Sequence, residues 1–463
     1  MILGIKLLLG LAALVLPGEL MLRWLAPASR WGWSRPLIAF GIGQGVATWC
    51  LWVLGMAGVP MWSWGMGIIL IASAGGLCLL RHARTSSSET TVILSADSGP
   101  RGMKQTGRKL WDILPWVLLA IASWVIAVQA AEEALRFRIG SVPGMGNWAY
   151  KTKLLLLTEK WPLDFFEYEA VNRRMGYPPG FPLLCGWCAV FMGGLETHAI
   201  RLLSVLLTIG TFILAGSEMI RLRRWWGMPG VAGLMALLLS RPGRDVLSGF
   251  YAEPLLLFTA AVTMILLARC DRHIGATSLF IVSAGTIAWV KNEGVAAFLL
   301  LTVLAFVFAK RSEISRKRIW MATICVALTM IVPWRIYLAT HGWHDESFEG
   351  TQVLGAGNWD RLCAAWNEYR KAMYRSGSQF GGAWWLLPVL LWGAWRMQKS
   401  VILPVTVFTA AGWVGVAIVM MMGSVEENFE WHLEAASRVL LCPSLLLLMG
   451  FPHLGESLHI KRS

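Results

Sequence analysis

The feature that most constrains this chain is a repeated alternation of long apolar runs with short charged segments. Fourteen runs follow one another, at residues 3–23, 37–58, 61–80, 113–131, 178–194, 199–219, 226–240, 254–269, 275–290, 295–309, 319–339, 383–395, 401–422 and 438–451. A helix satisfies its own backbone hydrogen bonds in lipid. Because each crossing takes roughly 20 apolar residues, we predict an all-α polytopic membrane protein with about 13–14 transmembrane helices.

The composition excludes the other broad classes of protein. Hydrophobic residues make up 56% of the 463 residues and charged residues 15%, whereas soluble domains contain roughly 25% charged residues. This balance excludes a disordered chain, a disulfide scaffold and an ordinary soluble enzyme. No segment alternates apolar and polar residues as a membrane barrel strand does. The first run lacks a small-residue cleavage site, so we expect it to remain as a helix.

The net charge of +14 indicates orientation in a membrane rather than nucleic-acid binding. The basic residues lie in short segments between apolar runs, and such segments face the cytoplasm. Residues 81–110 carry six Lys and Arg and are rich in Ser and Thr, so we predict a cytoplasmic linker. By the same rule the basic segments at 269–273, 310–318 and 396–399 lie inside, and we expect four loops outside: 132–177, 241–253, 340–381 and 423–437.

One group of basic residues conflicts with this topology. Arg221, Arg223 and Arg224 should lie inside by their charge. Two apolar runs separate them from the outward loop 132–177, which would place them outside. Either one run enters and leaves on the same side, or these arginines break the rule.

The chain divides into three parts on this interpretation. Residues 1–110 form extra transmembrane helices and the linker, 111–451 form the main transmembrane unit, and 452–463 form a cytoplasmic tail. The two longest outer loops contain 148–161 and 358–375, which mix Trp and Leu with Lys, Arg and Glu. Such a mixture is typical of an amphipathic helix lying in the membrane interface.

Charged residues gather at the outer ends of several runs. Charges at a membrane boundary are costly, so each is a candidate for function. The groups are Glu132 with Glu133, Tyr251 with Glu253, Lys291 with Asn292 and Glu293, and Trp431 with His432 and Arg438. Each also has a purely structural interpretation, such as a solvated helix end or an ion pair between helices. Since all four groups fall on one side, we predict that they surround one cavity.

These residue types suit glycosyl transfer from a lipid phosphate. A carboxylate at the interface can accept the proton of a hydroxyl or amine. Arg and Lys can hold a phosphate, and aromatic rings can pack against a sugar. The chain has no GxxxxGK[ST] motif, and its glycines at 41, 43 and 45 suit close helix packing rather than nucleotide binding.

Several short motifs resemble the membrane glycosyltransferases of the GT-C fold, and in particular a bacterial branch similar to family 39, related to protein O-mannosyltransferases and lipid A aminoarabinose transferases. The resemblance covers about 111–451. The matching stretches are 148–153, 177–183, 201–204, 249–254, 291–294, 332–335 and 431–443. It implies an inverting enzyme of the bacterial cytoplasmic membrane that takes a sugar from a polyprenyl phosphate on the outer face, with an acidic base in the first outer loop.

This chain departs from that pattern at the base. The branch carries an Asp about five residues before the tryptophan that matches Trp148, where this chain has Pro143. No Asp occurs between 132 and 163. Glu132 and Glu133 resemble the Asp-Glu pair of the wider superfamily, and we expect Glu133, or Glu132, to be the base.

The resemblance and the residue chemistry together give each candidate a role. Glu253 and Glu293 would orient the acceptor or a divalent cation, and Lys291, His432 and Arg438 would hold the donor phosphate. The other expected substrate-binding residues are Lys151, Lys153, Tyr177, Tyr251, Asn292 and Trp431. The acceptor would be a glycan, lipid or protein in contact with membrane lipids. The alternative is a non-catalytic transporter or flippase of lipid-linked glycans, although the chain shows no internal repeat of the kind transporters carry.

Overall fold

The computed structural model describes residues 2–26, 32–87, 109–136, 148–161, 176–248, 250–270, 274–309, 315–341, 358–374, 383–396, 401–422 and 438–459. These ranges are mostly α-helix and contain no β-strand, so the predicted all-α class is confirmed. In chain order the helices are α1 (Ile2–Ala13), α2 (Val15–Leu25), α3 (Arg35–Met56), α4 (Met66–Ser87), α5 (Lys109–Arg136), α6 (Tyr150–Thr158), α7 (Gly180–Met192), α8 (Thr197–Arg223), α9 (Met228–Leu239), α10 (Arg241–Ser248), α11 (Glu253–Leu267), α12 (Ile274–Val290), α13 (Glu293–Phe308), α14 (Arg316–Val326), α15 (Val332–Thr340), α16 (Asn358–Tyr374), α17 (Leu387–Arg396), α18 (Ile402–Met422) and α20 (Leu441–His459).

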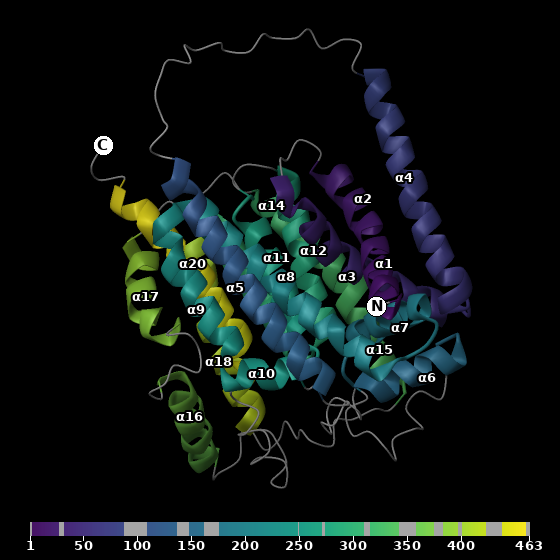
Figure 1. Ribbon diagram of the computed structural model, residues 1–463. Helices are drawn as coiled ribbons and strands as arrows, with labels where there is room; N and C mark the ends of the chain where they lie inside the picture. The colour runs from purple at the N-terminus through teal and green to yellow at the C-terminus, as the bar shows by residue number, and fades with distance from the viewer. Residues whose placement is uncertain are drawn as a thin grey trace.

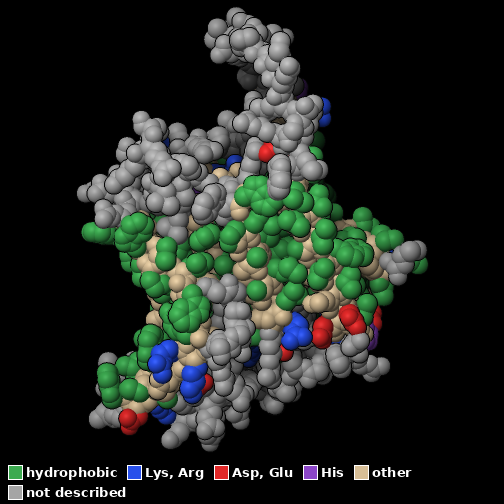
Figure 2. Space-filling view, turned by 60° about the vertical axis from the view of Figure 1, so that its left-hand side comes forward, with side chains coloured by type: hydrophobic (Ala, Val, Ile, Leu, Met, Phe, Trp, Pro, Cys, Tyr) green, Lys and Arg blue, Asp and Glu red, His purple; other side chains and the backbone are tan. Residues whose placement is uncertain are grey.

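Each predicted apolar run corresponds to an apolar helix. Seven helical segments of the described chain are long and apolar enough to cross a membrane: Ile2–Leu25, Gly32–Met56, Met61–Ala83, Asp112–Leu135, Thr197–Leu222, Arg316–Thr340 and Ile402–Val419. Shorter apolar helices cover the remaining runs, at Gly180–Met192, Met228–Leu239, Glu253–Leu267, Gly275–Val290, Glu293–Phe308, Ala383–Trp395 and Leu441–His453. In Figure 2 a broad hydrophobic surface covers the middle of the molecule, and most of the charged side chains visible there gather below it. The chain is a polytopic helical membrane protein.

The helices form a bundle with two distinct ends (Figure 1). We call the end where α4 finishes and α5 begins the linker end. The opposite end, where α6, α10 and α16 lie, is the far end. Helix α11 runs through the interior, and every one of its residues is buried. Its two threonines are satisfied inside the helix: the Thr259 hydroxyl donates to the Leu255 carbonyl at 2.8 Å, and the Thr263 hydroxyl donates to the Thr259 carbonyl at 2.7 Å, as Ser and Thr commonly do in buried helices.

The first helices belong to the same core as the rest. Gly41 and Gly45 let α3 approach α11 and α12 closely, because a Cβ on Gly45 would lie 2.2 Å from the Thr286 hydroxyl oxygen. The packing role expected for these glycines is therefore confirmed. The Trp187 indole of α7 donates to the Gly10 carbonyl of α1 at 2.9 Å. The boundary at residue 110 stays a prediction.

Helix α7 enters and leaves the bundle at the far end. Its 13 residues span only about 20 Å, which is short for a hydrocarbon core of about 30 Å. Gly180 at its start packs against Trp289, where a Cβ would lie 2.6 Å from the Trp289 carbonyl oxygen. Arg201, near the start of the following helix α8, donates to the Glu133 carbonyl at 3.2 Å. Glu133 lies near the end of α5 that is farthest from the linker.

This path resolves the conflict over the basic residues after α7. Since α8 starts at the far end, it finishes at the linker end, where Glu218 pairs with Arg221. The same carboxylate lies 3.7 Å from Arg269, which follows α11. Arg221 and Arg269 therefore lie at the end where α4 finishes and α5 begins, and this geometry favours α7 as the run that does not cross.

The two expected interfacial helices differ from each other. Helix α16 is amphipathic as predicted: Ala365, Tyr369 and Met373 are buried at a spacing of four residues, while Trp359 and Trp366 are exposed. Helix α6 buries Lys151, Thr152, Leu154 and Leu155 and exposes Lys153 and Leu157, so its position in the membrane interface stays a prediction. It packs on α7 and forms part of the core at the far end.

Candidate functional site

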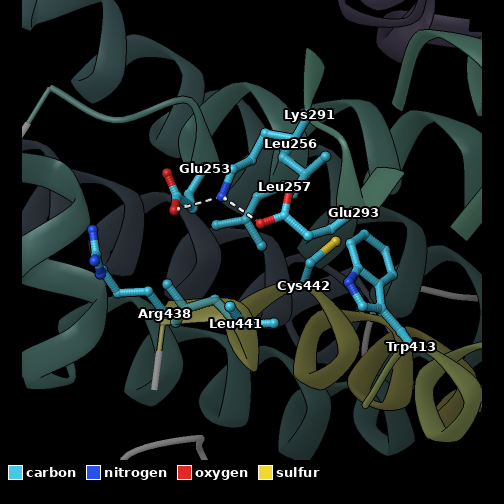
Figure 3. Close-up of a pocket in the computed structure, with 10 residues that line it drawn as sticks. Glu253, Leu256, Leu257, Lys291, Glu293, Trp413, Arg438, Leu441 and Cys442 are labelled. Atoms are coloured by element: carbon cyan, nitrogen blue, oxygen red, sulfur yellow. Dashed lines mark hydrogen bonds and ion pairs between the residues drawn. The ribbon is translucent and has the colours of Figure 1, made fainter. Parts of the chain in front are cut away.

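A pocket at the far end brings together several of the predicted site residues. It lies between the first turns of α11 and α13, the middle of α18 and the start of α20 (Figure 3). Its lining consists of Glu253, Leu256, Leu257, Lys291, Glu293, Trp413, Arg438, Val439, Leu441 and Cys442. Four of these ten residues carry charge, which is unusual for so buried a place in a membrane protein.

The centre of the pocket is Lys291, held between two carboxylates. Its ammonium nitrogen lies 3.1 Å from Glu253 Oε1 and 3.5 Å from Glu293 Oε1. The three side chains are 9–17% exposed. Burial lowers the pKa of Lys291, but attraction to Glu253 and Glu293 outweighs this effect and raises its pKa above the ordinary value. Lys291 is therefore a permanent cation.

Local sequence explains how these three residues are positioned. Glu253 and Glu293 each begin a helix, where the helix dipole favours a carboxylate. Pro254 follows Glu253 in the first turn, a position that proline favours. Lys291 lies in the short break between α12 and α13. Gly294 makes that break possible, because a Cβ there would lie 2.1 Å from the Ile287 carbonyl oxygen.

The second oxygen of each carboxylate is left without a hydrogen bond. Within the described chain, Glu253 Oε2 and Glu293 Oε2 are buried and have no hydrogen-bond partner. The Trp413 indole nitrogen is also buried and has no hydrogen-bond partner there. Buried polar groups are normally hydrogen-bonded. Two acceptors and one donor in one pocket therefore indicate a place for a polar ligand.

Aromatic rings hold the cations around this centre. The Arg438 guanidinium lies 4.6 Å from the centre of the Tyr251 ring, and it is close enough to Glu253 to attract the carboxylate. Tyr177 lies between two ammonium groups, 5.9 Å from Lys151 and 5.8 Å from Lys291. Such cation–π contacts help to hold these side chains in position.

Other predicted residues lie apart from the pocket lining. Glu132 and Glu133 lie near the end of α5, where Glu132 is exposed and Glu133 half-buried. Glu133 attracts the buried guanidinium of Arg201. Lys153 is exposed on α6, and Asn292 accepts a hydrogen bond from Arg335 at 3.0 Å. Trp431 and His432 lie outside the described residues.

Sequence reasoning did not find Trp413 and Cys442 of the pocket lining, or Tyr369, which lies close to it. Trp413 and Cys442 lie inside apolar runs, where nothing distinguishes them from residues that face lipid. Tyr369 of α16 is buried and interacts electrostatically with Glu293 and Lys291. Burial and the negative charge of Glu293 raise the pKa of Tyr369, so its phenol stays protonated. The four-residue spacing of Ala365, Tyr369 and Met373 was the one sequence sign that Tyr369 faces inward.

Behind Lys291 a group of tryptophans stabilises the turn. Trp52, Trp289 and Trp334 lie in mutual contact, with ring centres 5.4–6.4 Å apart; Trp334 meets the other two edge to face, and Trp52 and Trp289 are tilted. Trp161 joins them and donates to the Tyr337 hydroxyl at 2.7 Å. Contacts of this kind each contribute about 0.5–1.5 kcal/mol. Because Trp289 is two residues before Lys291, this group fixes the backbone that carries the ammonium.

No ready-made metal site accompanies these residues in the part of the chain that the structure describes. There, no three or more His, Cys, Asp or Glu gather closely enough to hold a metal ion. Both pocket carboxylates pair with Lys291, so the divalent cation considered from the sequence would have to compete with this ammonium.

Comparisons with models of protein families, with curated proteins and with solved structures find no match to this chain. The fold and the buried charges define a class: a polytopic helical membrane protein with an ionised pocket at one end of its bundle.

Proposed function

We propose that the protein is a membrane glycosyltransferase that moves a sugar from a polyprenyl phosphate to an acceptor on the outer face of a bacterial cytoplasmic membrane. The observation that carries this proposal is the pocket, in which Lys291 joins two carboxylates that each keep one oxygen without a hydrogen bond. Such a site offers acceptors to sugar hydroxyls and cations to a phosphate. It lies at a membrane boundary, where a lipid-linked donor presents its head group.

The position of the charges supports an outward-facing pocket. The basic residues Arg221 and Arg269 lie at the linker end, together with the basic linker. Basic segments face the cytoplasm. The far end, with Glu253 and Lys291, would then face outward.

In the proposed reaction the acceptor oxygen attacks the anomeric carbon while the bond from that carbon to the phosphate oxygen breaks. The acceptor proton passes to a carboxylate, and the lipid phosphate leaves with the electron pair. One direct displacement of this kind inverts the anomeric configuration. Arg438 would hold the leaving phosphate through its guanidinium.

We retain Glu133 as the base. Glu253 and Glu293 already share the ammonium of Lys291, so we assign them to binding. Glu133 is half-buried at the same end of the bundle, where an acceptor from outside would arrive. Its neighbour Arg201 is buried and carries the opposite charge, and the Arg201 side chain donates to the Glu133 carbonyl, which holds this helix end in place.

The test is sugar transfer by purified protein in lipid nanodiscs supplied with a radiolabelled polyprenyl-phosphate hexose. Transfer or slow hydrolysis that requires the protein supports the proposal. Glu133→Gln should lower the rate on the order of a hundredfold, with little change in donor affinity. Glu368→Gln on the exposed face of α16 is the matched control.

Two results would contradict parts of this proposal. Movement of the intact lipid-linked sugar across the bilayer without any sugar release would identify a flippase. Full activity of the Glu133→Gln and Glu132→Gln variants, each made separately, would move the base to Glu293 or Glu253.

A further inference from the structure

Three basic residues begin α14, at the end of the bundle opposite the pocket. Helix α13 starts at the far end with Glu293 and runs for 16 residues, so it finishes at the linker end. There the Arg316 guanidinium donates to the Val307 carbonyl of α13 at 3.2 Å. Arg316, Lys317 and Arg318 are the first three residues of α14, and we call them the basic patch.

The helix itself opposes three positive charges at this place. The N-terminus of a helix carries a partial positive charge, so cations in the first turn destabilise it. The first turn of α14 contains no acidic residue, whereas α11 and α13 begin with Glu253 and Glu293. The Ser315 hydroxyl accepts from the backbone N–H of Arg318 at 3.4 Å, but this neutral cap leaves the charge as it is. An anion from outside the helix would remove the conflict.

No carboxylate of the described chain supplies that anion. Among the residues that the structure describes, every ion pair joins a carboxylate to some other cation. Lys317 and Arg318 are exposed, and Arg316 is half-buried. The basic patch is therefore open to a negatively charged partner.

The surface beside the basic patch is apolar. Trp320 and Met321 of α14 are exposed, and so are Phe306 and Val307 of α13. In a protein that spans a membrane, apolar side chains exposed in this way face lipid, and tryptophan is enriched where the lipid chains meet the head groups. A partner that matches both surfaces has a negatively charged head and an apolar chain.

Contacts with α13 hold Arg316 at the boundary between these surfaces. Its guanidinium lies 5.2 Å from the centre of the Phe306 ring, a cation–π contact. Phe306 in turn packs against Trp320, with ring centres 6.3 Å apart. Together with the hydrogen bond to Val307, these contacts place the guanidinium between α13 and α14. A guanidinium that is already held in place loses less entropy when it binds a phosphate.

We propose that the basic patch, together with Phe306 and Trp320, binds the phosphate head of an anionic phospholipid whose chains lie against the exposed apolar surface of α13 and α14. Arg316 contacts the phosphate, and Lys317 and Arg318 add positive charge around it. This lipid is a bound partner and not a substrate, because its site lies at the opposite end of the bundle from the pocket. The inference is independent of the proposed function.

The experiment compares phosphatidylglycerol, which is anionic, with phosphatidylcholine of the same chain length, which is zwitterionic. Each lipid is titrated into the full-length protein in detergent, and bound lipid is counted by native mass spectrometry. The wild-type protein should bind phosphatidylglycerol about tenfold or more tightly than phosphatidylcholine. The double variant Lys317→Gln with Arg318→Gln should bind phosphatidylglycerol about tenfold or more weakly than wild type, with phosphatidylcholine unchanged.

The matched control removes the same number of charges at the far end. Lys160→Gln with Arg370→Gln replaces two exposed cations there and should keep the wild-type preference for phosphatidylglycerol. Arg316→Lys keeps the charge but loses the planar guanidinium. If Arg316 contacts the phosphate, this variant should bind phosphatidylglycerol about two- to tenfold more weakly.

Three results would overturn the proposal. The first is equal affinity of the wild-type protein for the two lipids. The second is unchanged binding of phosphatidylglycerol by the Lys317→Gln, Arg318→Gln variant, since the basic patch would then serve only to orient the chain in the membrane. The third is displacement of phosphatidylglycerol by an equal concentration of inorganic phosphate, because the apolar surface would then contribute nothing to binding.

Discussion

Lys291 and Glu253 are separated by 38 residues in the chain, yet the ammonium nitrogen of one lies 3.1 Å from a carboxylate oxygen of the other. The pair joins the end of α12 to the start of α11. Glu293 completes it from α13. The Lys291 ammonium therefore links the start of α11, the end of α12 and the start of α13 at one end of the bundle.

Removing the cation should destabilise the fold. Lys291→Met leaves two carboxylates buried side by side, and loss of one partner of a buried pair costs about 3–5 kcal/mol. The free energy of unfolding, measured by denaturant titration in mixed micelles, should fall by that order. Lys153→Met, at an exposed lysine of α6, is the control. The double variant Lys291→Met with Glu253→Gln should recover part of the loss, and no recovery would exclude charge as the cause.

The stability contribution of Lys291 should depend on pH only in alkaline conditions. Its pKa in the folded protein is raised above the ordinary value of about 10.4. A lysine whose pKa is higher in the folded than in the unfolded state stabilises the fold fully below the unfolded pKa. This contribution is lost as the pH rises through the folded pKa. The difference in unfolding free energy between wild type and Lys291→Met should thus stay constant from about pH 7 to 9 and shrink only above about 10.4. Loss of the difference near neutral pH would contradict the pairing.

The guanidinium of Arg438 should be needed for donor binding. It lies over the Tyr251 ring, and it can offer two parallel hydrogen bonds to a phosphate, which a lysine cannot. We expect Arg438→Lys to weaken binding of a short-chain isoprenyl phosphate by about 1–3 kcal/mol, with thermal unfolding unchanged. Arg370→Lys, at an exposed position of α16, should have no effect. Unchanged affinity in Arg438→Lys would leave this residue as a membrane anchor.

The topology of α7 can be tested by cysteine accessibility in whole cells. Glu196 directly follows α7, and Lys153 lies on α6 before it. If α7 enters and leaves at the far end, Glu196→Cys and Lys153→Cys should label from the same side, and Ser315→Cys at the start of α14 from the other. A background without Cys78 and Cys325 is needed because both are exposed. Labelling of Glu196→Cys from the side of Ser315 would mean that α7 crosses.

The sequence predicts the helices of this protein well because the length and apolarity of a run are local properties. Each of the fourteen predicted runs corresponds to an apolar helix. Glu253, Lys291, Glu293 and Arg438 could also be predicted, since an ionised side chain beside an apolar run is conspicuous wherever it lies.

What could not be predicted depends on contacts between distant parts of the chain. Trp413 and the group around Trp52 lie in apolar runs among 27 tryptophans, and only the packing of separate helices shows which of them face a pocket. The path of α7 is likewise decided by where Gly180 and Arg201 find their partners. The apolar composition of α7 is the same as that of a crossing helix.

The turn that carries Lys291 also limits how the chain can be inserted into a membrane during synthesis. A lysine or glutamate that enters lipid alone is opposed by a large desolvation cost. Glu253 is made first and Lys291 and Glu293 follow, at the same end of neighbouring helices. Helices α11, α12 and α13 should therefore reach a low-energy arrangement only when they leave the insertion machinery together, as a three-helix unit in which each carboxylate is paired with the ammonium of Lys291.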